Sequence, residues 1–240
     1  MRDVNVGGTE RVLDAAIAAG VRRIVHVSTV NAFGNTKGRV VDETYERRVE
    51  DGFLSAYDET KYAAHRVALE RAGGGAPVVI AQPGAAYGPG DESQIGEQLR
   101  LAQRGKLRYV TFGGLGFTAV HVDDVVIGLL LVLDSGLTGE SYVLGAEPTT
   151  MKEAVAIAAR TAGHKPPRLA MPTPMVRAMA PFGRVIGPLL GQPPNLSELV
   201  RASAGVTYWA THAKAQRELG YAPRDLETGL KEMAASTGSM

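Results

Sequence analysis

The 240-residue sequence predicts an α/β protein in which a doubly wound parallel sheet precedes a smaller, mostly helical C-terminal lobe. Short β-branched runs alternate with amphipathic stretches over about the first 145 residues, as in strands joined by crossover helices. From residue 149 onward the apolar residues recur mostly at helical spacing. The composition, with 45% hydrophobic and 21% charged residues, is that of an ordinary globular chain.

The first elements follow from local patterns. Residues 8–19 carry an apolar stripe at helical spacing. Residues 23–28 form a short run rich in β-branched residues, which is typical of a buried strand. Residues 34–52 are charged and rich in turn formers, so they predict a surface connection. A second helix is expected over residues 56–71, and the three glycines at 73–75 end it.

The alternation continues through the middle of the chain. Residues 78–82 predict a second buried strand, and the density of Gly and Pro predicts a loop over residues 83–90. Residues 92–104 have helical spacing. The remaining elements are expected, in order, as a strand at 117–121, a helix at 123–133, a strand at 141–144 and helices at 149–162, 173–190, 212–219 and 226–234.

Composition excludes several classes of function. A net charge of +1 gives no electrostatic reason to bind nucleic acid or an anionic membrane surface. Without cysteine the chain forms no disulfide, thiolate metal site or cysteine nucleophile, and its five histidines lack ligand spacing, so no metal is expected. No apolar run could span a bilayer and the N-terminus has no apolar signal region, so we expect a cytoplasmic protein without a membrane span.

Tyr57 and Lys61 are the most informative pair of residues. They stand four residues apart, so they share one face of the predicted helix. An ammonium group favours the phenolate form of a neighbouring tyrosine, so we expect Lys61 to lower the pKa of Tyr57. A tyrosine tuned in this way can act as an acid or a base near neutral pH. The spacing alone also fits a tyrosine packed on a lysine stem at the surface.

Polar or glycine-rich loops follow three of the predicted strands, at residues 28–29, 83–88 and 121–124. In open α/β sheets the ligand crevice lies at the carboxyl ends of the strands. The two hydroxyls, the Gly/Pro loop and the Tyr57–Lys61 pair are therefore expected to converge on one cleft.

In this order the motifs resemble the extended short-chain dehydrogenase/reductase family, also called the NAD-dependent epimerase/dehydratase family. The resemblance covers nearly the whole chain, and its matching stretches are residues 5–16, 25–34, Tyr57-x-x-x-Lys61, 82–90, 120–125 and 213–223. It implies a partial Rossmann-type doubly wound parallel sheet with a helical lobe. It also implies an NAD(P)-dependent oxidoreductase that transfers hydride between NAD or NADP and a carbonyl or alcohol carbon of a small organic substrate.

The resemblance also sets the expected domains. Residues 1–145 would be the C-terminal half of an NAD(P)-binding Rossmann domain. Residues 146–240 would be a helical substrate-binding lobe, to which residues 91–116 contribute. The family's Gly-x-x-Gly-x-x-Gly turn holds the cofactor pyrophosphate at a helix N-terminus, and this sequence has no such strand-to-helix turn. We therefore expect the N-terminal half of the domain to be missing, which leaves the strand near residues 24–28 as an exposed apolar edge.

The family's site residues carry over to matching positions. Tyr57 would be the general acid or base, and Lys61 would hydrogen-bond the nicotinamide ribose. Either Thr29 or Ser28 would hydrogen-bond the substrate oxygen, and the resemblance does not choose between them; Ser28 could also contact the cofactor. The loop residues expected beside the nicotinamide are Pro83, Gly84 and Ala85.

Other polar residues have two interpretations each. Asn5 matches either a proton-relay asparagine or a helix N-cap. Asp123 and Asp124 favour helix N-caps, and His121 favours a core or capping role. The aromatic pair that could line a substrate pocket or belong to the core is Tyr208 and Trp209.

Three functions remain open from the sequence. The C-terminal motifs resemble the dihydroflavonol-reductase-like branch, and Phe117 and Thr118 stand where the epimerases often carry an Arg-Asp pair. The first alternative is a sugar-nucleotide epimerase or dehydratase with bound NAD. The second is a catalytically silent binding protein or inactive fragment. A homodimer is expected either through the Tyr57 helix and the helix before it, as in the family, or through the exposed edge strand.

Overall fold

The computed structural model describes residues 1–171, 174 and 196–237. The helical elements are η1 (Asp3–Gly7), α1 (Gly8–Ala18), η2 (Val30–Phe33), η3 (Val49–Asp51), α2 (Ala56–Gly73), α3 (Gln94–Gln103), α4 (Val122–Ser135), α5 (Met151–Thr161), α8 (Leu196–Ser203), α9 (Ala213–Leu219) and α10 (Leu226–Thr237). The strands are β1 (Ile24–Val27), β2 (Val78–Pro83), β3 (Ala85–Tyr87), β4 (Tyr109–Val110), β5 (Gly116–His121), β6 (Ser141–Leu144), β7 (Pro148–Thr150), β8 (Leu169–Ala170) and β9 (Thr207–Tyr208).

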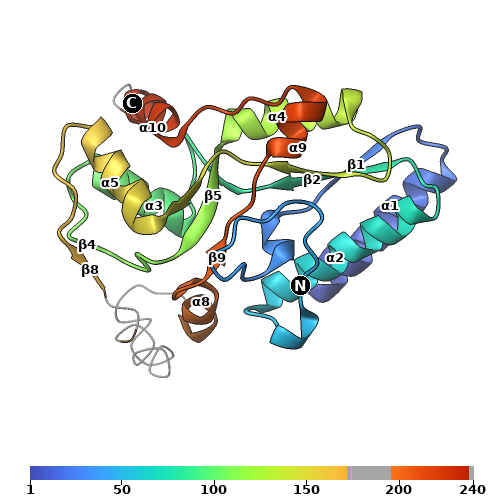
Figure 1. The fold of residues 1–240 in the computed structure, drawn as a ribbon, viewed down its shortest axis with the longest axis horizontal. Coiled ribbons are helices and arrows are strands. Elements are labelled where there is room, and N and C mark those ends of the chain that lie inside the picture. The colour runs from blue at the N-terminus through green and yellow to red at the C-terminus, as the bar shows by residue number, and fades with distance from the viewer. Residues whose placement is uncertain (172–173, 175–195, 238–240) are drawn as a thin grey trace.

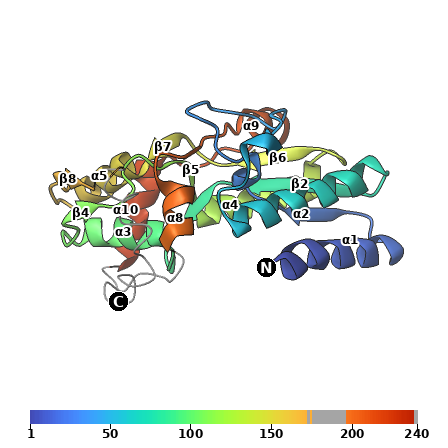
Figure 2. The same ribbon diagram turned by 90° about the horizontal axis from the view of Figure 1, so that it is seen from below.

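The first sheet is parallel and has the strand order β1-β2-β6 (Figure 1). Successive side chains of β2 point to opposite faces. Val78 and Ile80 pack against α1 and α2, whereas Val79 and Ala81 pack against α4 and α9. Figure 2 shows α1 and α2 along one side of this sheet and α9 on the other. Helices therefore cover both faces, which confirms the predicted doubly wound α/β fold.

A second sheet begins where the first one ends. It has the order β3-β5-β7, with β9 also paired to β5, and Gly84 alone separates β2 from β3. A side chain at Gly84 would overlap the carbonyl oxygen of Thr118 on β5, so glycine lets the two sheets meet. The loop predicted at 83–90 is therefore wrong for Pro83, which ends β2, and for residues 85–87, which pair in parallel with β5. The Gly and Pro residues mark the point where the chain passes from the first sheet to the second.

The lobe is built from helices of both halves of the chain. Leu99 of α3, Ala158 of α5 and Leu230 of α10 meet in one buried core against the second sheet. Residues 91–116 thus contain a helix that packs on the C-terminal helices, although the domain boundaries stay a prediction. The segment after residue 149 is not wholly helical, because β8 and β9 pair with β4 and β5. These strands have two residues each, too few to produce a period.

The helix expected at 173–190 falls almost entirely outside the described residues. Among the residues that are described, no helix has both the length and the apolar character that a membrane crossing requires.

Strand β1 is an edge strand of the described sheet, as the sequence predicted. It pairs with β2 on one side only, and Val27 at its end is 46% exposed. A groove of 420 Å³ runs between α1 and β1. Its lining includes the apolar side chains of Val4 and Val12 and the polar side chains of His26 and Lys61. Backbone N–H and C=O groups on such an edge are available to another strand.

Candidate active site

The helix that carries Tyr57 has a well-defined start. The Ser55 hydroxyl accepts a hydrogen bond from the Asp58 N–H at 3.0 Å and so caps α2. Asp58 and Glu59 lie in the first turn, where negative charge stabilises the helix N-terminus. Tyr57 is therefore fixed at the second position of α2, and the residue as a whole is 44% exposed.

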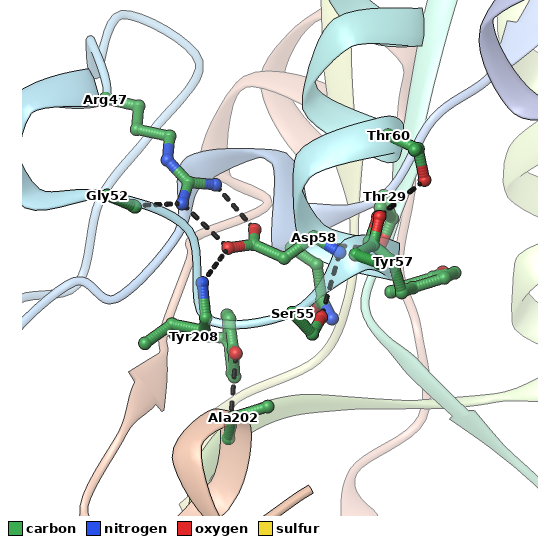
Figure 3. A network of polar contacts seen from close by, with 12 residues as sticks. Thr29, Arg47, Gly52, Ser55, Tyr57, Asp58, Thr60, Ala202 and Tyr208 are labelled. Atoms are coloured by element: carbon green, nitrogen blue, oxygen red, sulfur yellow. Dashed lines mark hydrogen bonds and ion pairs between the residues drawn. The ribbon is translucent and has the colours of Figure 1, made fainter. Parts of the chain in front are cut away.

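Thr29 meets Tyr57 at the carboxyl end of β1 (Figure 3). Its hydroxyl oxygen accepts a hydrogen bond from the Asn31 N–H at 3.2 Å and caps η2, which fixes the Thr29 rotamer. The same side chain lies near enough to the Tyr57 phenol to favour the phenolate, which lowers the pKa of Tyr57. The structure thus brings together two of the predicted site residues from segments 28 positions apart.

Ser28 is engaged elsewhere. It is buried, and its Oγ lies 3.0 Å from Nδ1 of His65, two turns along α2 from Tyr57. Successive residues of an extended segment point to opposite sides, so Ser28 and Thr29 diverge. Of the two hydroxyls that the sequence left open, Thr29 is the one that reaches the phenol.

The expected electrostatic effect of Lys61 is wrong for this structure. Burial raises the pKa of the Tyr57 phenol, and the hydrogen bond from Thr29 partly opposes that rise. Burial lowers the pKa of the Lys61 ammonium. The Lys61 Nζ donates to the Val27 carbonyl oxygen at 3.4 Å, so the long side chain turns toward β1. Spacing of i and i+4 aligns the stems of two side chains but does not decide where a flexible ammonium ends.

Asn5 does not cap a helix, contrary to one of its two interpretations. It lies inside η1, and its Nδ2 donates to Oγ1 of Thr60 at 3.0 Å. Oγ1 of Thr60 in turn donates to the Ala56 carbonyl oxygen at 2.8 Å. Asn5 therefore ties the N-terminal segment to the N-terminal part of α2, and its role in a proton relay stays a prediction.

The Gly/Pro segment lies at the junction of the two sheets. Pro83, Gly84 and Ala85 are half-buried there, and the Gly84 N–H donates to the Leu144 carbonyl oxygen at 2.9 Å. The close approach at Gly84 is made to the backbone of β5. This packing explains the glycine without a ligand, so contact of these three residues with a nicotinamide stays a prediction.

The third polar loop is used structurally. His121 caps α4, because its Nδ1 accepts a hydrogen bond from the Asp123 N–H at 3.3 Å. Asp124 is buried and forms a bidentate ion pair with Arg224 at 2.9 and 3.0 Å. The prediction that Asp123 and Asp124 cap α4 is therefore wrong, since His121 occupies the cap position and Arg224 holds Asp124.

The aromatic pair near the C-terminus also belongs to the framework. The Tyr208 hydroxyl donates to the Ala202 carbonyl oxygen at 3.1 Å, and Nε1 of Trp209 donates to the Thr149 carbonyl oxygen at 2.9 Å. Both polar atoms are thus used inside the fold, in keeping with the core interpretation.

Sequence reasoning missed one feature beside Tyr57. Arg47 forms a bidentate ion pair with Asp58 at 2.5 and 2.7 Å, and the two side chains are 5% and 2% exposed (Figure 3). The available signal was an aspartate in the first turn of the helix, next to the candidate tyrosine. No spacing rule connects it to an arginine eleven residues earlier in an irregular connection.

The chain is similar in sequence and in fold to known proteins. Residues 1–145 match the model of the NAD dependent epimerase/dehydratase family. The chain is 30% identical over 240 residues to sterol demethylase protein B of Methylococcus capsulatus, covering 97% of this chain and 71% of that protein. It is 32% identical over 238 residues to a putative dihydroflavonol 4-reductase of Synechocystis sp., covering 95% and 68%. The crystal structure of gox2253 superposes with a TM-score of 0.82 at 28% identity, covering 100% of this chain and 73% of that one.

Proposed function

Because the chain belongs to the NAD dependent epimerase/dehydratase family, we propose that it acts as an NAD(P)-dependent oxidoreductase of the dihydroflavonol-reductase-like branch. The observation that carries this proposal is the meeting of the Tyr57 phenol and the Thr29 hydroxyl at the carboxyl end of β1. The substrate would be a small organic molecule with a carbonyl or alcohol carbon. When bound, a nicotinamide cofactor would supply or accept the hydride, which no side chain can do.

The residues at the end of β1 suit the nicotinamide–ribose half of such a cofactor. The Lys61 ammonium makes a long contact to the Val27 carbonyl oxygen, at 3.4 Å, and has further donors to offer a ribose hydroxyl. His26 lines the same groove, and its buried Nε2 has no hydrogen-bond partner among the described residues. Both groups could be satisfied by the hydroxyls of a sugar.

In the part of the chain that the structure describes, no helix N-terminus that follows a strand suits the pyrophosphate half of the cofactor. The helices of more than four residues that directly follow a strand there are α4 and α5. Their first turns carry acidic residues, among them Asp123 and Glu153, which repel a phosphate. We therefore assign only the nicotinamide–ribose half to described residues.

The chain's own residues would handle the proton. The Tyr57 phenol, whose pKa is raised by burial, carries its proton at neutral pH, so Tyr57 can give this proton to the substrate oxygen during reduction. It would take a proton back from an alcohol in the reverse direction. Thr29, fixed by its cap on η2, would hold the substrate oxygen beside the phenol. Lys61 would orient the cofactor ribose.

The framework at Phe117 and Thr118 favours a less polar substrate over a sugar nucleotide. Both residues are buried in β5, and Oγ1 of Thr118 accepts a hydrogen bond from the Ala210 N–H at 2.8 Å. Because these two residues are Phe and Thr, neither supplies the positive charge from which an anionic pyrophosphate substrate would benefit. This supports the reductase over the epimerase or dehydratase.

Cofactor binding tests the proposal directly. We expect titration with NADH and NADPH, followed by nicotinamide fluorescence, to show saturable binding in the micromolar range for one of them. The Tyr57→Phe variant should bind within about twofold of the parent, because the phenol oxygen acts in proton transfer. Absence of binding up to millimolar cofactor would contradict the proposal for this chain and favour a silent binding protein.

We also propose a homodimer through the exposed side of α4. α4 packs on β1, and its outer side presents apolar residues at helical spacing. They are Val122, Val126, Ile127, Leu130 and Leu133. A second copy would bury the same uncharged stripe, which suits a two-fold interface.

Light scattering tests this association. We expect a mass of about twice 25.3 kDa at micromolar concentration, and a shift toward the monomer in Leu130→Lys. Leu169→Lys, at an exposed leucine of β8 far along the chain, is the matched control and should leave the mass unchanged. A monomeric parent contradicts the dimer. If Leu130→Lys remains a dimer, the interface is instead expected to be formed by α1 and α2.

A further inference from the structure

We propose that Arg47 and Asp58 are positioning residues, whose buried ion pair holds the Tyr57 phenol against the Thr29 hydroxyl. The inference rests on the proposed function, because it assigns a task to residues that support the Tyr57–Thr29 pair. Neither residue would touch substrate or cofactor. Together, Arg47 and Asp58 contact the two segments that carry Tyr57 and Thr29.

Asp58 organises the start of the helix that carries Tyr57. Its N–H is bound by the Ser55 hydroxyl, and its Oδ2 accepts from the Leu54 N–H at 2.9 Å. These contacts close the first turn of α2 from both sides. Since Tyr57 directly precedes Asp58 in that turn, a shift of Asp58 would turn the phenol away from its present position.

Arg47 reaches the segment that begins with Thr29. Thr29 caps the N-terminus of η2, and Gly34 ends this short helix with φ of 71°. A side chain at Gly34 would lie 2.8 Å from Cζ of Arg47, so the end of η2 is shaped around the guanidinium. The guanidinium therefore packs on the element that Thr29 starts while it binds the element that holds Tyr57.

The remaining contacts keep the guanidinium in one orientation. Its Nη2 also donates to the Gly52 carbonyl oxygen at 3.0 Å. The Phe53 ring lies 4.4 Å and the Tyr62 ring 5.5 Å from Cζ of Arg47, within the range of cation–π attraction. A planar guanidinium with two parallel bonds to a carboxylate fixes angles as well as distance, which a lysine ammonium cannot do. Such geometry suits positioning more than simple charge neutralisation.

The Arg47→Lys variant tests the proposal because it keeps the positive charge and removes the planar guanidinium with its two parallel hydrogen bonds. If the paired hydrogen bonds of Arg47 position Tyr57, the kcat of the variant should be roughly 10–100-fold below that of the parent at equal folded fraction. The KM for cofactor should change by less than about threefold. The Tyr57 pKa should rise, since the opposing effect of the Thr29 hydroxyl is weakened. Tyrosine ring ¹³C NMR reports that pKa without turnover, and Tyr57→Phe assigns the signal.

The matched control is Arg48→Lys. Arg48 is the next residue, and its side chain is exposed with Glu50 at 3.9 Å. This variant should change neither kcat nor the Tyr57 pKa. If Arg47→Lys also leaves the Tyr57 pKa and kcat unchanged, or lowers only thermal stability, the pair is structural and the positioning proposal is overturned.

The test still gives an answer if the parent shows no turnover or if the variant does not fold. If the parent shows no turnover, the proposed function fails, while the NMR titration still decides whether Arg47 positions Tyr57. If Arg47→Lys does not fold, Phe53→Leu removes one ring that stacks on the guanidinium and keeps the ion pair. It should move the Tyr57 pKa in the same direction by a smaller amount, and an unchanged pKa there overturns the proposal.

Discussion

Replacing Tyr57 with phenylalanine is expected to lower kcat by roughly 10²–10⁴-fold, because the substrate oxygen then loses its proton donor. The phenol oxygen is the single atom removed, and the ring, the cap at Ser55 and the helix remain. Cofactor binding should therefore persist, and the loss should appear in kcat and in kcat/KM alike. Steady-state kinetics together with nicotinamide fluorescence on the same preparation separate the two effects.

The two neighbouring hydroxyls supply the controls for this result. Thr29→Val should also reduce kcat, since the hydroxyl that meets the phenol is lost, whereas Thr29→Ser should restore most of it. Ser28→Ala should leave kcat nearly unchanged, because Ser28 is committed to His65. If Tyr57→Phe kept more than about a tenth of the parent kcat, a different group would be the proton donor.

Stability is expected to fall steeply as the pH drops from about 6.5 toward 4. Burial lowers the pKa of both His26 and His65 from 6.5 to about 4, so each is neutral in the folded protein at pH 5. The unfolded chain binds these two protons below pH 6.5 and the folded chain does not, so acid favours unfolding. At pH 5 the loss relative to pH 7.5 should be about 2 kcal/mol for each histidine.

Urea denaturation at pH 7.5 and pH 5 measures this effect. His65→Gln should reduce the difference in unfolding free energy between the two pH values, while His164→Gln, at an exposed histidine, should leave it unchanged. His26 and His65 repel each other when charged, so their contributions need not add. Equal stability of the parent at both pH values would show that neither histidine is held neutral by the fold.

The order of elements was within reach of sequence reasoning, and the meeting of the two sheets was not. Apolar periodicity located α1, α2, α4, β1, β2 and β6, because each buries one stripe or run against the core. β3 was missed because its pairing with β5 depends on distant residues, and the local Gly and Pro pointed to a loop. The two-residue strands β8 and β9 have no local signature at all.

The candidate site shows the same division. Sequence spacing alone placed Tyr57 and Lys61 on one helix and the hydroxyls of Ser28 and Thr29 after a strand, because helical and strand periods are local properties. The tertiary structure decided that Thr29 meets the phenol, that Ser28 serves His65, and that Lys61 turns to the Val27 carbonyl.

The charge environment of Tyr57 likewise belongs to the folded molecule. The sequence determined that a phenol stands one residue before an aspartate, in the first turn of a helix. Only the tertiary structure paired that aspartate with Arg47 and buried the phenol enough to raise its pKa. The physical reason is that burial and ion pairing depend on which distant segments exclude water from a group, and no local spacing encodes that.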